Sequence, residues 1–461
     1  MQKISLKNYV LIISALASFL TPFMSSSVNV ALPAMVTQFQ IDVIMQNWIP
    51  SSYLLSAAIF AVPFGRISEI YGMKKVFTGG MIIFTISSFL SAIAPSAMEL
   101  IIFRILQGVG SAMIFVTSLA LISEVFPPQE RGKAIGITVA VVYTGLSLGP
   151  VLGGILTRNF GWPSIFLITI PIGILTIIMV LGKVKAEWVK EKGKKFDMVG
   201  SVLYSLGLFM LMYGFSTLPG LIGIGLFLMG IVLMVGFVKW ELFYTSPIFN
   251  MKLFKNFTFA FSSLAALINY SATFAVALLL SLFLQYIKGL DAQTTGLILV
   301  AQPVVMAIVA PLAGRLSDKK DPQVLAAIGM GITTAGLFTL AFISENTSMT
   351  FIILSLVMLG LGFGMFSSPN TNAIMGSVQR KYYGIASATV SSMRLIGQTF
   401  SLGIVTLIFS FIIGRAYISP EFYPALLQST QVAFILFSML CFTGIFASLA
   451  KRKRKKLAID I

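Results

Sequence analysis

The sequence predicts an all-α, polytopic membrane protein with fourteen transmembrane helices. Hydrophobic residues make up 57% of the 461 residues and charged residues only 10%, whereas a soluble domain has about 25% charged residues. Fourteen apolar runs are long enough to cross the roughly 30 Å of bilayer hydrocarbon. Lysines and arginines also alternate from loop to loop between many and few, which is typical of a polytopic membrane protein.

Each apolar run is continuous and does not alternate with polar residues, so we expect helices and not the strands of a barrel. The first run follows Lys3 and Lys7 but is too long for the apolar core of a signal peptide, so it counts as a helix. In chain order the runs cover residues 8–31, 47–65, 76–94, 99–123, 134–156, 162–183, 197–216, 219–240, 258–286, 292–314, 323–343, 349–372, 384–413 and 426–450.

The positions of the basic residues predict the orientation of the chain. With the N-terminus in the cytoplasm, 27 of the 32 lysines and arginines fall on the cytoplasmic side and three fall outside, while Arg104 and Arg394 lie within helices. We therefore expect a multi-pass protein of the plasma membrane with both termini in the cytoplasm. The basic tail 451–456 is interpreted as a solvated end near anionic lipid, and no nucleic-acid partner is expected.

Several function classes are excluded by composition. The chain has no histidine, which removes histidine-based zinc sites and Ser-His-Asp catalysis. It has one cysteine, Cys441, so it forms no internal disulfide. It has no phosphate-binding loop of the form G-x-x-x-x-G-K-[ST]. We expect no enzyme activity, no metal and no cofactor.

An internal repeat predicts the domain organisation. Gly65-Arg66-Ile67-Ser68-Glu69 follows the second run, and Gly314-Arg315-Leu316-Ser317-Asp318 follows the tenth. Two directly joined six-helix units would place the second copy after the eighth run, so two helices are inserted between the units. The expected arrangement is 6+2+6, with bundles at 1–183 and 258–461 and an insertion at 184–257.

The stretch 65–75 resembles the cytoplasmic loop signature of the major facilitator superfamily, and the fourteen-helix layout is similar to its drug:proton antiporter branch. The resemblance implies the fold of that superfamily, with a substrate site near the bilayer midplane. Gly65 and Gly72 are expected to permit a tight turn, with Lys74 and Lys75 on the cytoplasmic side. Glu69 stands where the family usually has aspartate.

A carboxylate at this position of the loop can lock one access state by facing helix N-termini and a basic partner. In the second copy of the repeat, Asp318 fills the equivalent place and Gly314 and Arg315 precede it. The alternative is a solvated loop whose charges only set the orientation.

Helix four carries Arg104-Ile105-Leu106-Gln107-Gly108-Val109-Gly110, which resembles the family signature R-x-x-Q-G-x-G. An arginine embedded in a membrane is unfavourable unless it meets water, a carbonyl or an anion. Gln107 lies one turn further along the same face, so the pair is expected to line a polar cavity. The alternative is that Arg104 reaches the interface by snorkelling.

Helix five carries a glycine-rich stretch, 145–154, that resembles the G-x-x-x-G-P-x-x-G-G pattern of antiporters. Glycines four residues apart let a second helix approach closely, and a proline bends the helix. The alternative is ordinary close packing. The motif positions are Gly145, Gly149, Pro150, Gly153 and Gly154.

The acidic residues depart from the pattern of the antiporter branch. Residues 27–33 resemble its T-x-V-N-V-A-L-P stretch and include Asn29, but the slot where the branch typically has aspartate holds Met24. None of the fifteen acidic residues falls in the middle of a run. Glu99 and Glu124, at the two ends of helix four, are therefore the candidates for proton coupling.

Arg394 lies near the middle of the thirteenth run, residues 384–413, and therefore near the bilayer midplane, one turn before Gln398. Two embedded arginines without an embedded acid disfavour a permanently cationic drug and favour neutral, zwitterionic or anionic amphiphiles. Aromatic side chains could complete the cavity: Tyr53, Tyr143, Tyr270 and Phe115.

The expected function is secondary active export of amphiphilic drugs or related small molecules by alternating access, coupled to protons in antiport. Such multidrug efflux would confer antibiotic resistance. The alternative is a specific exporter or facilitator of a neutral or anionic metabolite without proton coupling. The expected partners are membrane lipid, a small amphiphilic substrate and protons, and the chain is expected to act as a monomer.

Overall fold

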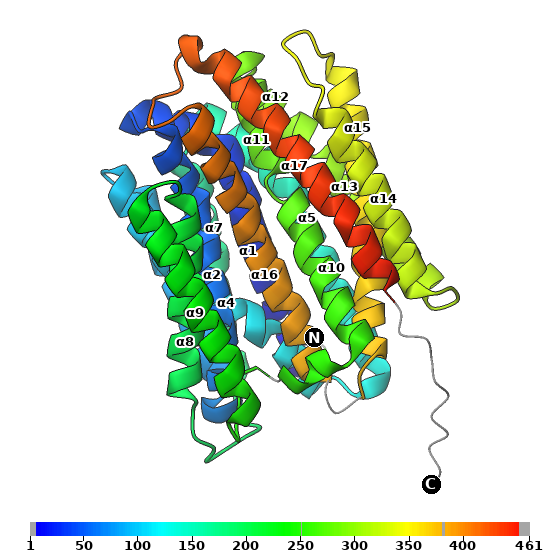
Figure 1. The fold of residues 1–461 in the computed structure, drawn as a ribbon. Helices are drawn as coiled ribbons and strands as arrows, with labels where there is room; N and C mark the ends of the chain where they lie inside the picture. The colour runs from blue at the N-terminus through cyan, green and yellow to red at the C-terminus, as the bar shows by residue number, and fades with distance from the viewer. Residues whose placement is uncertain (1–5, 250, 380–382, 451–461) are drawn as a thin grey trace.

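The computed structural model describes residues 6–249, 251–379 and 383–450, and its regular elements are helices (Figure 1). Within these residues, fourteen helical segments are long and apolar enough to cross a membrane, which confirms the predicted fold class. Part of the orientation argument lies outside the described residues, namely Lys3, Arg380, Lys381 and the tail 451–456.

The first six spans pack as one group of helices. Helix α1 lies along α5, while α2 and α3 both pack on α4. The sixth span consists of the short helix α6 and the longer α7. The bounds are α1 Leu6–Phe39, α2 Val43–Tyr71, α3 Met73–Ala92, α4 Ala97–Val125, α5 Pro128–Phe160, α6 Ser164–Leu167 and α7 Thr169–Lys183.

The next two spans, α8 (Met198–Ser216) and α9 (Leu221–Phe243), form a hairpin at one side of the molecule (green in Figure 1). The break between them confirms the predicted separation of the seventh and eighth runs. The hairpin packs beside α2, where Tyr204 Oη donates a hydrogen bond to the Ala58 carbonyl at 3.0 Å. It also packs against α16, so it touches helices from both ends of the chain.

The last six spans form a second group. The ninth span is divided into α10, α11 and η2, and the tenth into α12 and α13. The bounds are η1 Met251–Lys255, α10 Phe257–Thr273, α11 Val276–Leu282, η2 Phe283–Ile287, α12 Ala292–Leu299, α13 Ala301–Ser317, α14 Pro322–Leu340, α15 Met349–Gly376, α16 Tyr383–Ile412, η4 Pro420–Phe422 and α17 Tyr423–Leu449.

Capping residues, and not hydropathy, decide where α2 begins. The helix starts after Asp42, whose side chain accepts a hydrogen bond from the Met45 backbone N–H at 2.7 Å. Capping of this kind satisfies backbone donors in water, so a helix extends past the apolar run that crosses the lipid.

The turn that ends α2 lies further along than the sequence predicts. Gly65 lies inside α2, so only Gly72, with φ +120°, makes the turn to α3. Gly314 and Arg315 likewise lie inside α13, which runs to Ser317. The prediction that these stretches are loops was wrong at those positions, because polar residues continue a helix beyond the hydrocarbon.

The two groups of helices meet mainly at one end of the molecule. We call the end that carries the Gly72 turn the basic end, and the opposite end the far end; both ends of the described chain lie at the basic end (Figure 1). At the far end α5 packs on α12, α2 on α16 and α1 on α11. Asn47 Nδ2 donates to the Leu402 carbonyl at 3.0 Å, across the α2–α16 contact.

Candidate functional site

A central cavity of about 240 Å³ lies between the two groups of helices. Its wall comes from α1, α2, α4 and α5 on one side and from α10, α15 and α16 on the other. A second compartment of about 110 Å³ adjoins it. The residues that line both compartments are Tyr143, Leu146, Tyr270, Phe274, Arg394 and Gln398.

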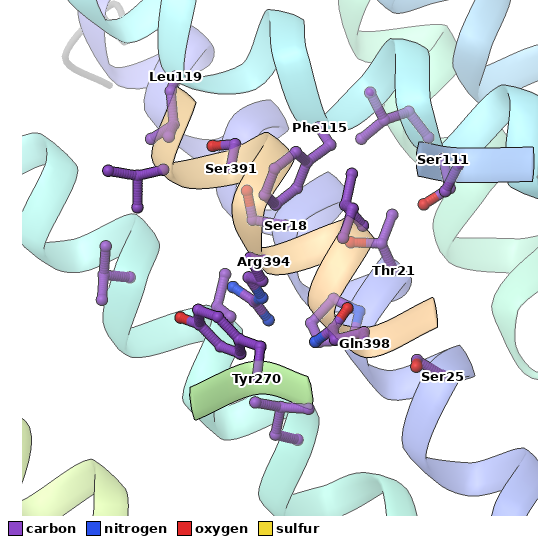
Figure 2. A pocket seen from close by; sticks show the side chains of 18 of the residues that line it. Ser18, Thr21, Ser25, Ser111, Phe115, Leu119, Tyr270, Ser391, Arg394 and Gln398 are labelled. Atoms are coloured by element: carbon purple, nitrogen blue, oxygen red, sulfur yellow. The ribbon is translucent and has the colours of Figure 1, made fainter. Parts of the chain in front are cut away.

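Arg394 projects from α16 into this cavity, between Tyr270 and Gln398 (Figure 2). The central carbon of its guanidinium group lies 5.8 Å from the Tyr270 ring centroid and 5.9 Å from that of Phe115. Both distances are within cation–π range. Within the described chain no carboxylate and no hydrogen-bond acceptor is paired with the Arg394 side chain. The guanidinium is therefore available to a ligand.

Among the described lining residues of both compartments, Arg394 is the one charged side chain. The expected coupling residues, Glu99 and Glu124, lie elsewhere. Glu99 accepts a hydrogen bond from Ser96 Oγ at 2.8 Å in the first turn of α4, and Glu124 pairs with Lys190 at 2.5 Å in its last turn. Neither carboxylate faces the cavity, because each lies at an end of α4.

The expectation that Arg104 and Gln107 line the cavity was wrong. Both residues lie behind the cavity wall and line neither compartment. Arg104 is fully buried, donates a hydrogen bond to Gln107 Oε1, and lies 4.2 Å from the ring centroid of Tyr53. Gln107 donates in turn to Ser88 Oγ at 2.7 Å, which ties α4 to α3. The arginine therefore supports the wall through Tyr53.

The other predicted cavity residues lie on the wall. Tyr53 lines the central cavity and donates to Ser111 Oγ at 2.8 Å. Tyr143 and Ser367 form a hydrogen bond at 3.0 Å, which joins α5 to α15 across the cavity. Asn29 lines the second compartment, where its Oδ1 lacks a donor within the described chain.

The glycines of 145–154 make close helix contacts. Gly149 faces α1, and a β-carbon placed there would lie 1.9 Å from Ser26 Oγ. Gly154 faces α12, and its β-carbon would lie 2.3 Å from the Ala292 carbonyl oxygen. On the facing helix, a β-carbon at Gly296 would lie 2.1 Å from the Pro150 carbonyl oxygen. The motif therefore builds both the α1–α5 contact and the closure at the far end.

The two copies of the repeat differ in their contacts. Arg66, only 9% exposed, pairs with Glu69 at 2.9 Å and with Glu191 at 2.5 Å, and donates to Ser246 Oγ at 2.6 Å. Arg315, the equivalent residue, is exposed, and no partner is found for it in the described chain; Asp318 is also exposed. In the described chain the arginine of the first copy joins α2 to distant segments, whereas the second copy contacts α15 through Ser317, which accepts a hydrogen bond from Asn372 Nδ2 at 2.6 Å.

The segment 184–197, which we call the linker, is held against the α2–α3 turn. The backbone N–H groups of Lys190 and Glu191 both donate to the Glu69 carbonyl at 3.0 Å. Beside Gly72, the Lys74 N–H donates to Glu187 Oε1 at 2.8 Å. Lys75 is exposed. The sequence does not predict these contacts, because the only recognisable feature of residues 184–197 is their high lysine content.

The ion pairs of the linker predict a dependence on pH. Burial alone raises the pKa of the Glu191 carboxyl, but hydrogen bonds and charge from Arg66 and Lys194 outweigh it and lower that pKa. A lowered pKa stabilises the fold above the ordinary value of about 4.3, and the stability is lost as the pH falls through the folded-state value. We expect hydrogen exchange of residues 184–197 to stay slow from pH 8 to 5.

Exchange of these amides, corrected for the intrinsic pH effect, should rise only in stronger acid. The Glu191→Gln variant is the control, since it has no charge to lose and should show a flat profile. A rise near neutral pH in the unaltered chain would contradict the assignment.

The sequence analysis did not predict that two carboxylates are buried. Asp197 and Glu241 are 1% and 2% exposed at the basic end of the α8–α9 hairpin. Asp197 accepts from the Gly200 N–H at 2.8 Å, and Glu241 accepts from the Phe249 N–H at 2.9 Å. Both lie outside the lining of the two compartments. Burial of a residue at a helix end is a tertiary property that local sequence does not carry.

Comparisons with known proteins agree with this architecture. The sequence profile of the Major Facilitator Superfamily matches residues 14–402 and 262–459. The riboflavin transporter RibZ of Clostridioides difficile (strain 630) is 32% identical over 400 residues, which is 86% of each protein. The multidrug resistance protein Stp of Mycobacterium tuberculosis (strain CDC 1551 / Oshkosh) is 30% identical over 404 residues, covering 86% of this chain and 74% of that protein.

A solved structure gives the same fold. It is a bacterial homolog of the human lysosomal transporter Spinster in an inward-facing and unoccupied conformation. The TM-score is 0.67 at 18% identity, and the alignment covers 96% of this chain and 98% of that one.

Proposed function

The chain belongs to the Major Facilitator Superfamily and is therefore a secondary transporter and not an enzyme; on that premise we propose that it exports amphiphilic small molecules by alternating access. We place it in the drug exporter branch because of its fourteen spans and the 145–154 motif. In this proposal residues 1–183 and 258–461 are the two moving bodies, and 184–257 is the insertion between them. The chain acts as a monomer in the cell membrane, with both termini in the cytoplasm.

The observation that carries the proposal is the central cavity together with its closure at the far end. The cavity lining is amphipathic, with serine, threonine and tyrosine hydroxyls among aliphatic and aromatic side chains. At the far end, Ser281 Oγ donates to the Asn29 carbonyl at 2.9 Å, and Arg158 pairs with Asp291 at 2.8 Å. A substrate would enter from the basic end and leave after these contacts separate.

Two candidate functions differ in whether protons drive the transport. Proton antiport through Glu99 or Glu124 would place the proton site at an end of α4, away from the cavity. The second candidate is export of a neutral or anionic metabolite without proton coupling. It is favoured by the described lining residues, which include no carboxylate, and by the similarity to a riboflavin transporter.

Transport by the purified full-length chain in liposomes tests the proposal. We expect saturable movement of amphiphilic dyes, faster than in protein-free liposomes. Collapse of an imposed proton gradient should stop transport if protons drive it and leave transport unchanged if they do not. Absence of saturable movement of neutral, anionic and cationic amphiphiles alike would contradict the proposed function.

A further inference from the structure

We propose that the substrate is an anionic, planar aromatic amphiphile whose acidic group pairs with Arg394, and that its export is driven by the membrane potential. This inference rests on the proposed function and names the substrate class of the same cavity.

The charge in the cavity selects for an anion. Arg394 is the one charged side chain among the described lining residues of both compartments. An unpaired guanidinium is unfavourable in a cavity that closes away from water. A carboxylate, phosphate or ionised imide can accept two parallel hydrogen bonds from the guanidinium fork and remove that penalty. A cationic amphiphile would add repulsion in the same space.

The shape around Arg394 selects for a flat ring system. The guanidinium carbon lies 5.8 Å from the Tyr270 ring and 5.9 Å from the Phe115 ring, so two aromatic side chains flank the charge. In the adjoining compartment, Phe363 packs edge-on against Tyr270 with the ring centroids 5.5 Å apart. An aromatic body that enters this compartment gains offset or edge-to-face contacts.

The second compartment also offers a hydrogen-bond acceptor. Asn29 lines it, and the Asn29 Oδ1 atom has no donor within the described chain. A buried acceptor without a donor is unfavourable. A substrate with an N–H or O–H group on its ring system would supply the missing donor. The ligand chemistry is therefore an acidic group at one end and a donor on a planar aromatic body.

The charge of such a substrate settles its energy source. The cytoplasm is electrically negative, so an anion moves outward with the membrane potential. One elementary charge crossing 100 mV sustains a concentration ratio of about fiftyfold. Export of an anion needs no exchanged proton, which agrees with a cavity whose described lining includes no carboxylate.

Two dyes of matched shape test the inference. Resorufin is a planar tricyclic monoanion, and thionin is a planar tricyclic cation of similar size. The full-length chain is placed in liposomes whose membrane potential is set by potassium and valinomycin. We expect resorufin to move faster than thionin, and to accumulate on the positive side up to the fiftyfold ratio per 100 mV.

Three variants separate the role of the charge from folding. Arg394→Gln should slow resorufin transport by about tenfold or more, because charge-assisted hydrogen bonds are lost. Arg394→Lys keeps the charge without the fork and should restore part of the rate. Arg415→Gln makes the same change at an exposed arginine at the far end and should have no effect. Elution as a monodisperse peak and an unchanged Tm verify the fold of each variant.

Each outcome decides the inference. Faster transport of thionin, insensitivity of resorufin transport to the potential, or a normal rate in folded Arg394→Gln would overturn it and leave the proposed exporter function standing. If Arg394→Gln does not fold, the dye preference and the potential dependence of the unaltered chain decide. Transport of neither dye, nor of any neutral amphiphile, would overturn both the inference and the proposed function.

Discussion

Replacing Gly296 with alanine is expected to slow transport strongly and to leave the far end open. The added β-carbon would lie 2.1 Å from the Pro150 carbonyl oxygen, so α5 and α12 must separate. Overpacking of this kind costs about 1–3 kcal/mol, which lowers the population of the far-end-closed state by about 5- to 150-fold. Exporters need both closed states, so the transport rate should fall with that population.

The opening can be measured with a single reactive cysteine. Cys441 is buried and is replaced by alanine, and Thr295, which is fully buried beside Gly296, is replaced by cysteine. We expect a membrane-impermeant maleimide to label this cysteine faster in the Gly296→Ala variant. Gly236→Ala is the matched control, because a β-carbon at Gly236 meets nothing within 4 Å. Equal labelling and equal transport in the single-cysteine background, its Gly296→Ala variant and its Gly236→Ala variant would show that the α5–α12 contact does not close the far end.

Replacing Arg66 with alanine is expected to release the linker from the α2–α3 turn. The variant loses the ion pairs with Glu69 and Glu191 and the hydrogen bond to Ser246. Removing one member of a buried pair costs several kcal/mol, but the two carboxylates are 38% and 28% exposed, so we expect about 1–2 kcal/mol. Hydrogen exchange of the Lys190 and Glu191 amides should accelerate by about 5- to 30-fold.

The second copy of the repeat provides the control for this prediction. Arg315→Ala makes the same change at an exposed residue for which no partner is found in the described chain, so exchange of the linker should be unchanged. Arg66→Lys should keep part of the protection, since a lysine carries the charge but lacks the planar fork that reaches two carboxylates. Equal exchange in Arg66→Ala and the unaltered chain would show that the linker is held by its backbone contacts alone.

The two embedded arginines show where sequence reasoning ends. Both Arg104 and Arg394 were identified as buried cations, and both were expected to line the cavity. The structure places Arg394 in the cavity and Arg104 behind Tyr53, where Arg104 donates to Gln107 and to the Ile49 carbonyl and lies over the Tyr53 ring. The face that a helix turns toward a cavity depends on which helices pack around it, and local sequence does not state that.

The repeat shows the same limit. Its two copies have nearly the same residues, but only Arg66 meets Glu191 and Ser246, which belong to segments more than a hundred residues away in the chain. The 145–154 motif behaved differently, because its glycine spacing itself specifies close helix contact, and the structure has that contact on both faces of α5.

The sequence by itself determined that the chain is an all-helical membrane protein with fourteen spans, because lipid permits only helices and closed barrels and the apolar runs are long and continuous. Only the tertiary structure decided that one arginine faces the cavity, that the described cavity wall carries no carboxylate, and that the far end is closed. These properties depend on helix rotation and on contacts between distant segments. Because lipid requires every span to be apolar, the hydropathy of a span does not show which of its faces contacts a neighbouring helix.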